Sequence, residues 1–125
     1  MVILITGKQN AGKTFYATSL KLELELEGRK VVLLDGDEWR QKHKNTDFSD
    51  EGRVINLISA SKEAERFENM GYIVLMSFIA PKKKWRETMS KYWSVSRVVY
   101  IPGGTLWEGT SYEKPDDEEL NLKVI

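Results

Sequence analysis

The 125-residue sequence contains no cysteine. This absence excludes a disulfide framework, a zinc site with cysteine ligands and a thiol nucleophile. Long hydrophobic runs are also missing, since no apolar stretch approaches the roughly 18 residues of a membrane span. Lys8 and Lys13 follow the apolar N-terminal stretch at once, which argues against a signal peptide. We therefore expect a cytoplasmic protein without a membrane partner.

An excess of charge of one sign is absent too. Lysine plus arginine number 19, as do aspartate plus glutamate. A balanced chain has no overall positive field to attract a polyanion, which disfavours nucleic acid as a partner without excluding it. The hydrophobic content of 41% and the charged content of 30% are ordinary for a folded protein. The length predicts a single domain over residues 1–125.

Short apolar runs alternate with segments of helical composition along the chain. Strands are expected at 2–6, 30–35, 72–77 and 97–101, and the alternation of Leu120, Leu122 and Val124 predicts an edge strand over 118–125. Helices are expected from residue 14 to the turn at Gly28 and over 36–43, 51–70 and 81–92. This order predicts an α/β fold of three layers, with a parallel sheet of about five strands between helices.

The first expected strand leads into the pattern Gly-x-x-x-x-Gly-Lys-Thr, which predicts a phosphate-binding P-loop. Glycines let the backbone N–H groups point at phosphate oxygens, Lys13 reaches the β and γ phosphates, and the Thr14 hydroxyl can ligate magnesium. An incidental glycine turn is the other interpretation, and the flanking strand and helix argue against it. We expect ATP and Mg²⁺ at the loop residues Gly7, Lys8, Gln9, Asn10, Ala11, Gly12, Lys13 and Thr14.

Two carboxylates, Asp35 and Asp37, follow the second expected strand. Ligands of parallel sheets bind beyond the carboxyl ends of the strands, so these carboxylates are expected near the γ-phosphate. Asp35 would hold magnesium together with Thr14, and Asp35 or Asp37 would orient an acceptor hydroxyl and take its proton. With Lys13 they are the expected catalytic residues. A tight turn that merely caps a helix is the alternative.

The order of these and later motifs resembles the adenylylsulfate kinase family, which phosphorylates the 3′-hydroxyl of adenosine 5′-phosphosulfate. The motifs are "DGD" at 35–37 with Arg40 after it, "FS" at 48–49 with Arg53 and Asn56, "SFIAP" at 77–81, and Trp107 before "SYEKP". The resemblance implies a nucleotide-kinase-like P-loop NTPase fold with strand order 2-3-1-4-5. It also implies transfer of the γ-phosphoryl group of ATP to a small nucleotide, adenylylsulfate, and leaves a homodimer open.

The same resemblance implies roles on the acceptor side. Phe48 and Trp107 would stack on the adenine of the acceptor, while Arg40, Arg53 and Asn56 would hold its phosphosulfate group near the Ile79 backbone. Each residue also has a structural interpretation, because aromatic side chains can simply cover the core and single arginines are often solvated.

One departure from the family concerns the segment "YIPGGTLWEG" at 100–109. The family has a helix and a cationic lid here, and a lid excludes water from the transferring group. Two alternatives follow from its loss. In the first, the open site accepts a nucleotide within a polynucleotide, whose phosphate backbone would contact a cationic cluster of Lys82, Lys83, Lys84 and Arg86. The other interpretation of this cluster is a solvated helical turn. The chain could also be an ATP-binding module with little catalysis.

Overall fold

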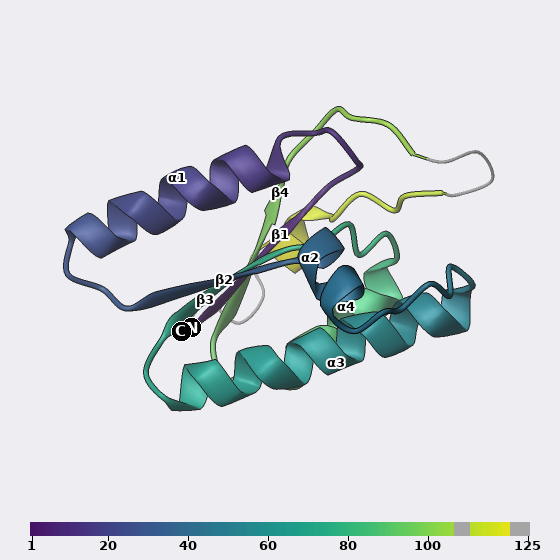
Figure 1. Ribbon diagram of the computed structural model, residues 1–125. Coiled ribbons are helices and arrows are strands. Elements are labelled where there is room, and N and C mark those ends of the chain that lie inside the picture. The colour runs from purple at the N-terminus through teal and green to yellow at the C-terminus, as the bar shows by residue number, and fades with distance from the viewer. Residues whose placement is uncertain (107–110, 121–125) are drawn as a thin grey trace.

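The computed structural model describes residues 1–106 and 111–120 (Figure 1). The strands are β1 (Val2–Thr6), β2 (Val31–Asp35), β3 (Ile73–Ser77) and β4 (Ser96–Tyr100). The helices are α1 (Lys13–Leu26), α2 (Gly36–Lys42), α3 (Asp50–Asn69), α4 (Lys83–Ser90) and α5 (Asp117–Leu120). The alternation of strands and helices predicted from the sequence is thereby confirmed through β4.

The four strands form one parallel sheet in the order β2-β3-β1-β4. Val2 lies opposite Val74 on one side and Ser96 on the other, which fixes the register of the central strand. β1 and β3 occupy the centre, and β3 is buried along its whole length, as continuous apolar strands in parallel sheets are. The order agrees with the predicted 2-3-1-4, and the described residues contain four strands instead of five.

The predicted edge strand over 118–125 is wrong for its described part, which belongs to helix α5. Asp116 Oδ1 accepts a hydrogen bond at 2.7 Å from the backbone N–H of Glu119, as a capping residue does. Three acidic residues in the first turn of the helix favour this conformation further. Residues 121–125 lie outside the described residues.

Helices cover both faces of the sheet (Figure 1). Ala17 of α1 packs with Ile5 and Leu75 on one face. Ala60 and Met89, from α3 and α4, pack with Leu4 and other strand residues on the opposite face. This is the predicted three-layer arrangement, and it leaves the carboxyl ends of β1, β2 and β3 at one edge. None of the described helices combines the length and apolar character that a membrane crossing requires.

The cationic cluster at 82–86 contacts the segment 111–120. Lys82 Nζ donates to Ser111 Oγ at 2.6 Å, and Lys83 Nζ pairs with Asp116 at 2.7 Å. Arg86 is buried, so the interpretation of these residues as a solvated helical turn is wrong for it. The helix starts at Lys83 rather than Pro81, because Lys82 is extended and the Pro81 carbonyl accepts from Glu113 N–H at 2.7 Å.

Candidate functional site

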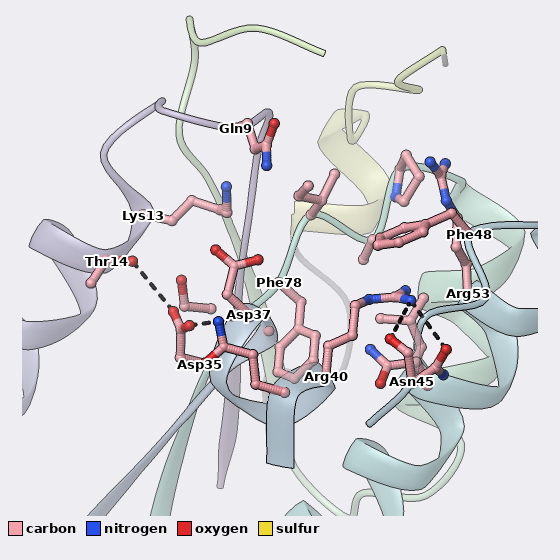
Figure 2. Close-up of a pocket in the computed structure, with 18 of the residues that line it drawn as sticks. Gln9, Lys13, Thr14, Asp35, Asp37, Arg40, Asn45, Phe48, Arg53 and Phe78 are labelled. Atoms are coloured by element: carbon pink, nitrogen blue, oxygen red, sulfur yellow. Dashed lines mark hydrogen bonds between the residues drawn. The ribbon is translucent and has the colours of Figure 1, made fainter. Parts of the chain in front are cut away.

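A cavity of about 980 Å³ opens at the carboxyl ends of β1, β2 and β3 (Figure 2). Its lining brings together most of the site residues expected from the sequence. These are Gln9, Asn10, Gly12, Lys13, Thr14, Asp35, Asp37, Arg40, Phe48, Arg53, Asn56 and Ile79. Gly7, Lys8 and Ala11 are not among its lining residues, and Trp107 lies outside the described residues.

The P-loop has the backbone conformation that its glycines favour. Gly12 is the N-cap of α1 with φ 102°, and Asn10 has φ 60°, so the chain turns twice through the left-handed region before the helix begins. The first N–H groups of α1 therefore face the cavity end that the loop surrounds. Lys13 Nζ donates to the Lys8 carbonyl at 2.7 Å, across the loop.

The segment 101–105 lies directly beside the P-loop. Thr105 N–H donates to the Gln9 carbonyl at 2.8 Å, and these residues form an antiparallel bridge. A Cβ on Gly104 would lie 2.4 Å from the Gln9 carbonyl oxygen, and one on Gly7 would lie 2.5 Å from the Ile101 carbonyl oxygen. Gly7 and Gly104 thus permit close backbone contacts between the P-loop and the segment 101–105 that follows β4.

Lys13 is partly withdrawn from water at the loop. Burial lowers the pKa of its ammonium group, while the charges of Asp37 and Asp35 act in the opposite direction. A phosphate bound beside it would add a negative charge that favours the protonated form of the amine. Lys13 therefore has the charge and the position to bind a phosphate oxygen at this end of the cavity.

Thr14 and Asp35 bring two oxygen ligands together. The Thr14 hydroxyl donates to Asp35 Oδ1 at 3.3 Å, and Oδ2 of the same carboxylate accepts from the N–H groups of Asp37 and Glu38 at 3.2 Å each. Asp35 is therefore the N-cap of α2 as well as the neighbour of Thr14. The two interpretations of this carboxylate, a capping residue and a candidate metal ligand, are compatible in the structure.

The oxygen donors of Thr14 and Asp35 suit magnesium. Mg²⁺ binds to proteins through one or two oxygen ligands and takes its remaining ligands from water and substrate phosphates. The described residues hold no cluster of three or more acidic, histidine or cysteine side chains that could form an all-protein cage. The donor set therefore fits a metal that arrives with a nucleotide.

Arg40 organises the loop between α2 and α3. Its Nη1 donates to the Asp47 carbonyl at 3.0 Å and to Asn45 Oδ1 at 3.2 Å, and its guanidinium lies 4.6 Å from the centre of the Phe48 ring. Burial lowers the pKa of Arg40, and the neighbouring charge of Arg53 lowers it further. Arg40 lines the cavity as expected, and it also fixes the aromatic ring beside it.

The start of α3 is held by a second set of contacts that the sequence did not single out. Asp47 Oδ1 accepts from the N–H and the hydroxyl of Ser49, and these hydrogen bonds lower the pKa of Asp47. A Cβ on Gly52 would lie 2.5 Å from the Asp47 carbonyl oxygen, so only glycine lets the loop approach the helix this closely. Ser49 Oγ in turn accepts from the N–H of Gly52 at 3.2 Å and caps α3.

Asn56 is a buried polar residue in the lining of the cavity. Its side chain is 5% exposed, and its Oδ1 makes no hydrogen bond to any residue in the described ranges. A buried polar oxygen without a partner is costly unless a ligand satisfies it. Because Asn56 lines the cavity, the amide is available to a polar group of a substrate.

Ile79 is fixed by residues from the two ends of the chain. Its carbonyl accepts from the Thr6 hydroxyl at 2.5 Å, and Thr6 also shares a 2.7 Å hydrogen bond with the Tyr112 hydroxyl. Tyr112 belongs to the "SYEKP" motif, so this motif closes the wall behind Ile79. Sequence reasoning noted the motif but assigned no contact to its tyrosine.

Comparisons with known proteins agree with this geometry. Residues 1–102 match the family model described as adenylylsulphate kinase. The chain belongs to this family. It is similar to a probable adenylyl-sulfate kinase of Archaeoglobus fulgidus, with 41% identity over 91 residues. That match covers 72% of this chain and 59% of the relative, so the chain spans about six-tenths of the relative's length.

Solved structures of this family share the fold. The structure of a cysteine-to-alanine mutant of the APS kinase CysC from Mycobacterium tuberculosis has a TM-score of 0.80 at 25% identity, and the match covers 93% of this chain and 80% of that one. The same kinase in complex with AMPPNP and APS has a TM-score of 0.77 at 25% identity, over 81% of this chain and 61% of that one. The predicted P-loop kinase fold is therefore confirmed.

Proposed function

We propose that this protein transfers the γ-phosphoryl group of ATP to the 3′-hydroxyl of adenylylsulfate, as a single domain over residues 1–125. The observation that carries the proposal is the shared cavity, which has the P-loop at one end and the family's acceptor motif residues at the other. A structural neighbour was solved with AMPPNP and APS, which supports the pairing of these two ligands.

On the donor side, the P-loop amides and Lys13 would hold the β and γ phosphates. Thr14 and Asp35 would hold magnesium, which supplies charge neutralisation at the phosphate oxygens when bound. Lys13 lies within the cavity lining beside Asp37 and Asp35, so its cation would approach the oxygen between the β and γ phosphates. Catalysis of this kind depends mainly on position and electrostatics.

On the acceptor side, the Phe48 ring is half-exposed and lines the cavity, with Arg40 over it, and this ring would stack on the adenine. Arg53 and Asn56 would hold the phosphosulfate group, the first by charge and the second through its amide. Ile79 would form the wall next to them. The amide nitrogen of Asn56 would donate to an oxygen of the phosphosulfate group, whereas its unpartnered Oδ1 needs a donor and would accept from a hydroxyl or amino group of the ligand.

Asp37 lies between the two ends of the cavity (Figure 2). Its charge acts on Lys13 toward the donor end and on Arg40 toward the acceptor end. In the proposed reaction the 3′-hydroxyl oxygen forms a bond to the γ-phosphorus while the bond from that phosphorus to the β–γ bridging oxygen breaks. The hydroxyl proton passes to Asp37, and ADP leaves with the broken bond's electron pair.

A second candidate is an ATP-binding module with little turnover. The segment 101–106 passes directly beside the P-loop, and the sequence predicts that this part of the chain lacks the helix and the lid of the family. If no lid covers the site, as in the part of the chain that the structure describes, water has access to the γ-phosphate, which favours hydrolysis or slow transfer. The polynucleotide alternative receives less support, because Lys82 and Lys83 donate to Ser111 and Asp116.

The experiment incubates the protein with γ-labelled ATP, Mg²⁺ and separate acceptors: adenylylsulfate, adenosine and an oligonucleotide. Label on adenylylsulfate, at the 3′ position, is the expected result, with an Asp37→Asn variant slowed at least 100-fold. Label on the oligonucleotide alone would replace this proposal with the polynucleotide activity. Binding of ATP with label on no acceptor would establish the module.

A further inference from the structure

Phe15 is a large aromatic side chain that faces solvent at the donor end of the cavity. It is 80% exposed, although it lies in the first turn of α1 and directly follows Thr14. Phe15 also lines the cavity, together with Leu106 from the segment beside the P-loop. The exposed Leu22 of the same helix does not belong to the cavity lining. An exposed aromatic ring at the entrance to a binding cavity suggests a ligand that covers it.

Successive P-loop residues contact successive groups of a bound nucleotide, and this order indicates which part of the nucleotide lies near Phe15. The lysine reaches the β and γ phosphates, the following hydroxyl meets the metal, and the amides at the start of the helix surround the α and β phosphates. The residue after Thr14 therefore lies toward the α-phosphate, where the nucleoside begins. The neighbouring side chains on the phosphate side are polar or cationic, whereas Phe15 and Leu106 are apolar.

We propose that Phe15 is a stacking surface for the nucleoside of the donor nucleotide, an inference that rests on the proposed phosphoryl-donor function. Aromatic side chains bind bases through their faces, and every nucleobase has such a face. The contact would hold the nucleoside at an open site where no covering segment is described. It also makes the donor site tolerant, because stacking does not read the hydrogen-bonding edge of the base.

The test compares a nucleotide with a phosphate chain that has no nucleoside. Isothermal titration measures the dissociation constants of Mg·ATP and of Mg·tripolyphosphate for the wild type, Phe15→Ala, Phe15→Trp and Leu22→Ala. Phe15→Ala is expected to weaken ATP binding about tenfold and to leave tripolyphosphate binding unchanged. Phe15→Trp retains the wild-type affinity for ATP, and Leu22→Ala changes neither affinity. Mg·GTP is expected to behave as Mg·ATP does across the series.

Two results would overturn the inference, and they are distinguishable. Equal effects of Phe15→Ala on ATP and tripolyphosphate, including no effect on either, would show that the ring does not contact the nucleoside while the donor site stands. Failure of the wild type to bind either ligand would refute the donor site itself, and the proposed function with it. Because Phe15 is exposed, all variants are expected to unfold at the wild-type temperature, which circular dichroism checks.

Discussion

The Thr14 hydroxyl donates a hydrogen bond to Asp35 Oδ1 at 3.3 Å, although 21 positions separate the two residues in the sequence. The contact joins the start of α1, which follows the P-loop, to the end of β2, where the "DGD" motif begins. The fold thus brings the candidate metal ligand Asp35 within hydrogen-bonding distance of the phosphate-binding loop. The first prediction concerns this pair.

Replacing Asp35 separates its two roles. Asp35→Asn retains an oxygen that can cap α2, so the free energy of unfolding should fall by only a few tenths of a kcal/mol, whereas Asp35→Ala should lose about 1 kcal/mol. Both variants should lose the magnesium-dependent part of ATP affinity, because an amide is a weaker ligand than a carboxylate. Urea unfolding and titration of ATP with and without Mg²⁺ measure the two effects. Full magnesium dependence in Asp35→Asn would refute the metal role.

Nucleotide affinity should depend on pH through Lys13. The protonated form binds phosphate, and burial lowers the pKa of Lys13 from its ordinary value of 10.5, against the opposing charges of Asp37 and Asp35. Affinity for Mg·ATP is therefore present at neutral pH and is lost as the pH rises, beginning below the range of an exposed lysine. Lys13→Arg should bind with a flat profile up to pH about 10, because arginine stays charged. Parallel profiles for the two proteins would contradict this account.

Gly104 should be required for the position of the P-loop. Gly104→Ala would place its Cβ 2.4 Å from the Gln9 carbonyl oxygen, at a φ of 78°. We expect a loss of about 1 kcal/mol or more in the free energy of unfolding, together with weaker ATP binding. Gly103→Ala is the matched control, since its φ of 87° is similar but nothing lies within 4 Å of the added Cβ. Equal ATP affinities in the two variants would show that the contact with Gln9 does not position the loop.

Arg86 and Glu119 form an ion pair in which each side chain is 1% exposed. Arg86 also donates to the carbonyl oxygens of Ala80 and Glu113 at 2.7 and 2.6 Å, so it joins α4 to the segment 111–120. Arg86→Met should cost about 3–5 kcal/mol, because it leaves a buried carboxylate without its partner. Arg86→Met with Glu119→Leu should recover part of this loss. Urea unfolding measures both, and a double variant less stable than the single would contradict the explanation.

The sequence predicted the parts of this structure that local physics determines. Buried strands such as Val2–Thr6 are short and apolar up to their last residue, and the P-loop pattern fixes a strand, a turn and a helix within a few residues. The sequence also predicted Asp35 beyond the carboxyl end of its strand, and the family resemblance implied Arg53 and Asn56 on the acceptor side. All three line the cavity.

The sequence could not predict contacts between distant residues. Arg86 lies in a run of cations that is typical of a solvated surface, and its burial depends on partners that no local pattern reveals, above all Glu119, 33 positions away, and the Glu113 carbonyl. The alternation near Leu120 indicated a strand, but the cap from Asp116 and the ion pair of Glu119 favour one helical turn. Arg40 was expected either to hold the phosphosulfate group or to be solvated, and its contacts with Asn45 and Asp47 depend on a loop conformation that has no sequence signature.

The central claim is that one cavity holds donor and acceptor at the same time. Titration of adenylylsulfate into protein saturated with Mg·AMPPNP tests it directly, using the wild type and Asn56→Leu. The account predicts that the wild type binds one adenylylsulfate while retaining AMPPNP. Asn56→Leu should retain AMPPNP and wild-type or greater stability, because an unpartnered buried oxygen is removed, yet lose adenylylsulfate binding. Displacement of AMPPNP by adenylylsulfate, or equal adenylylsulfate affinity in the two proteins, would contradict the account.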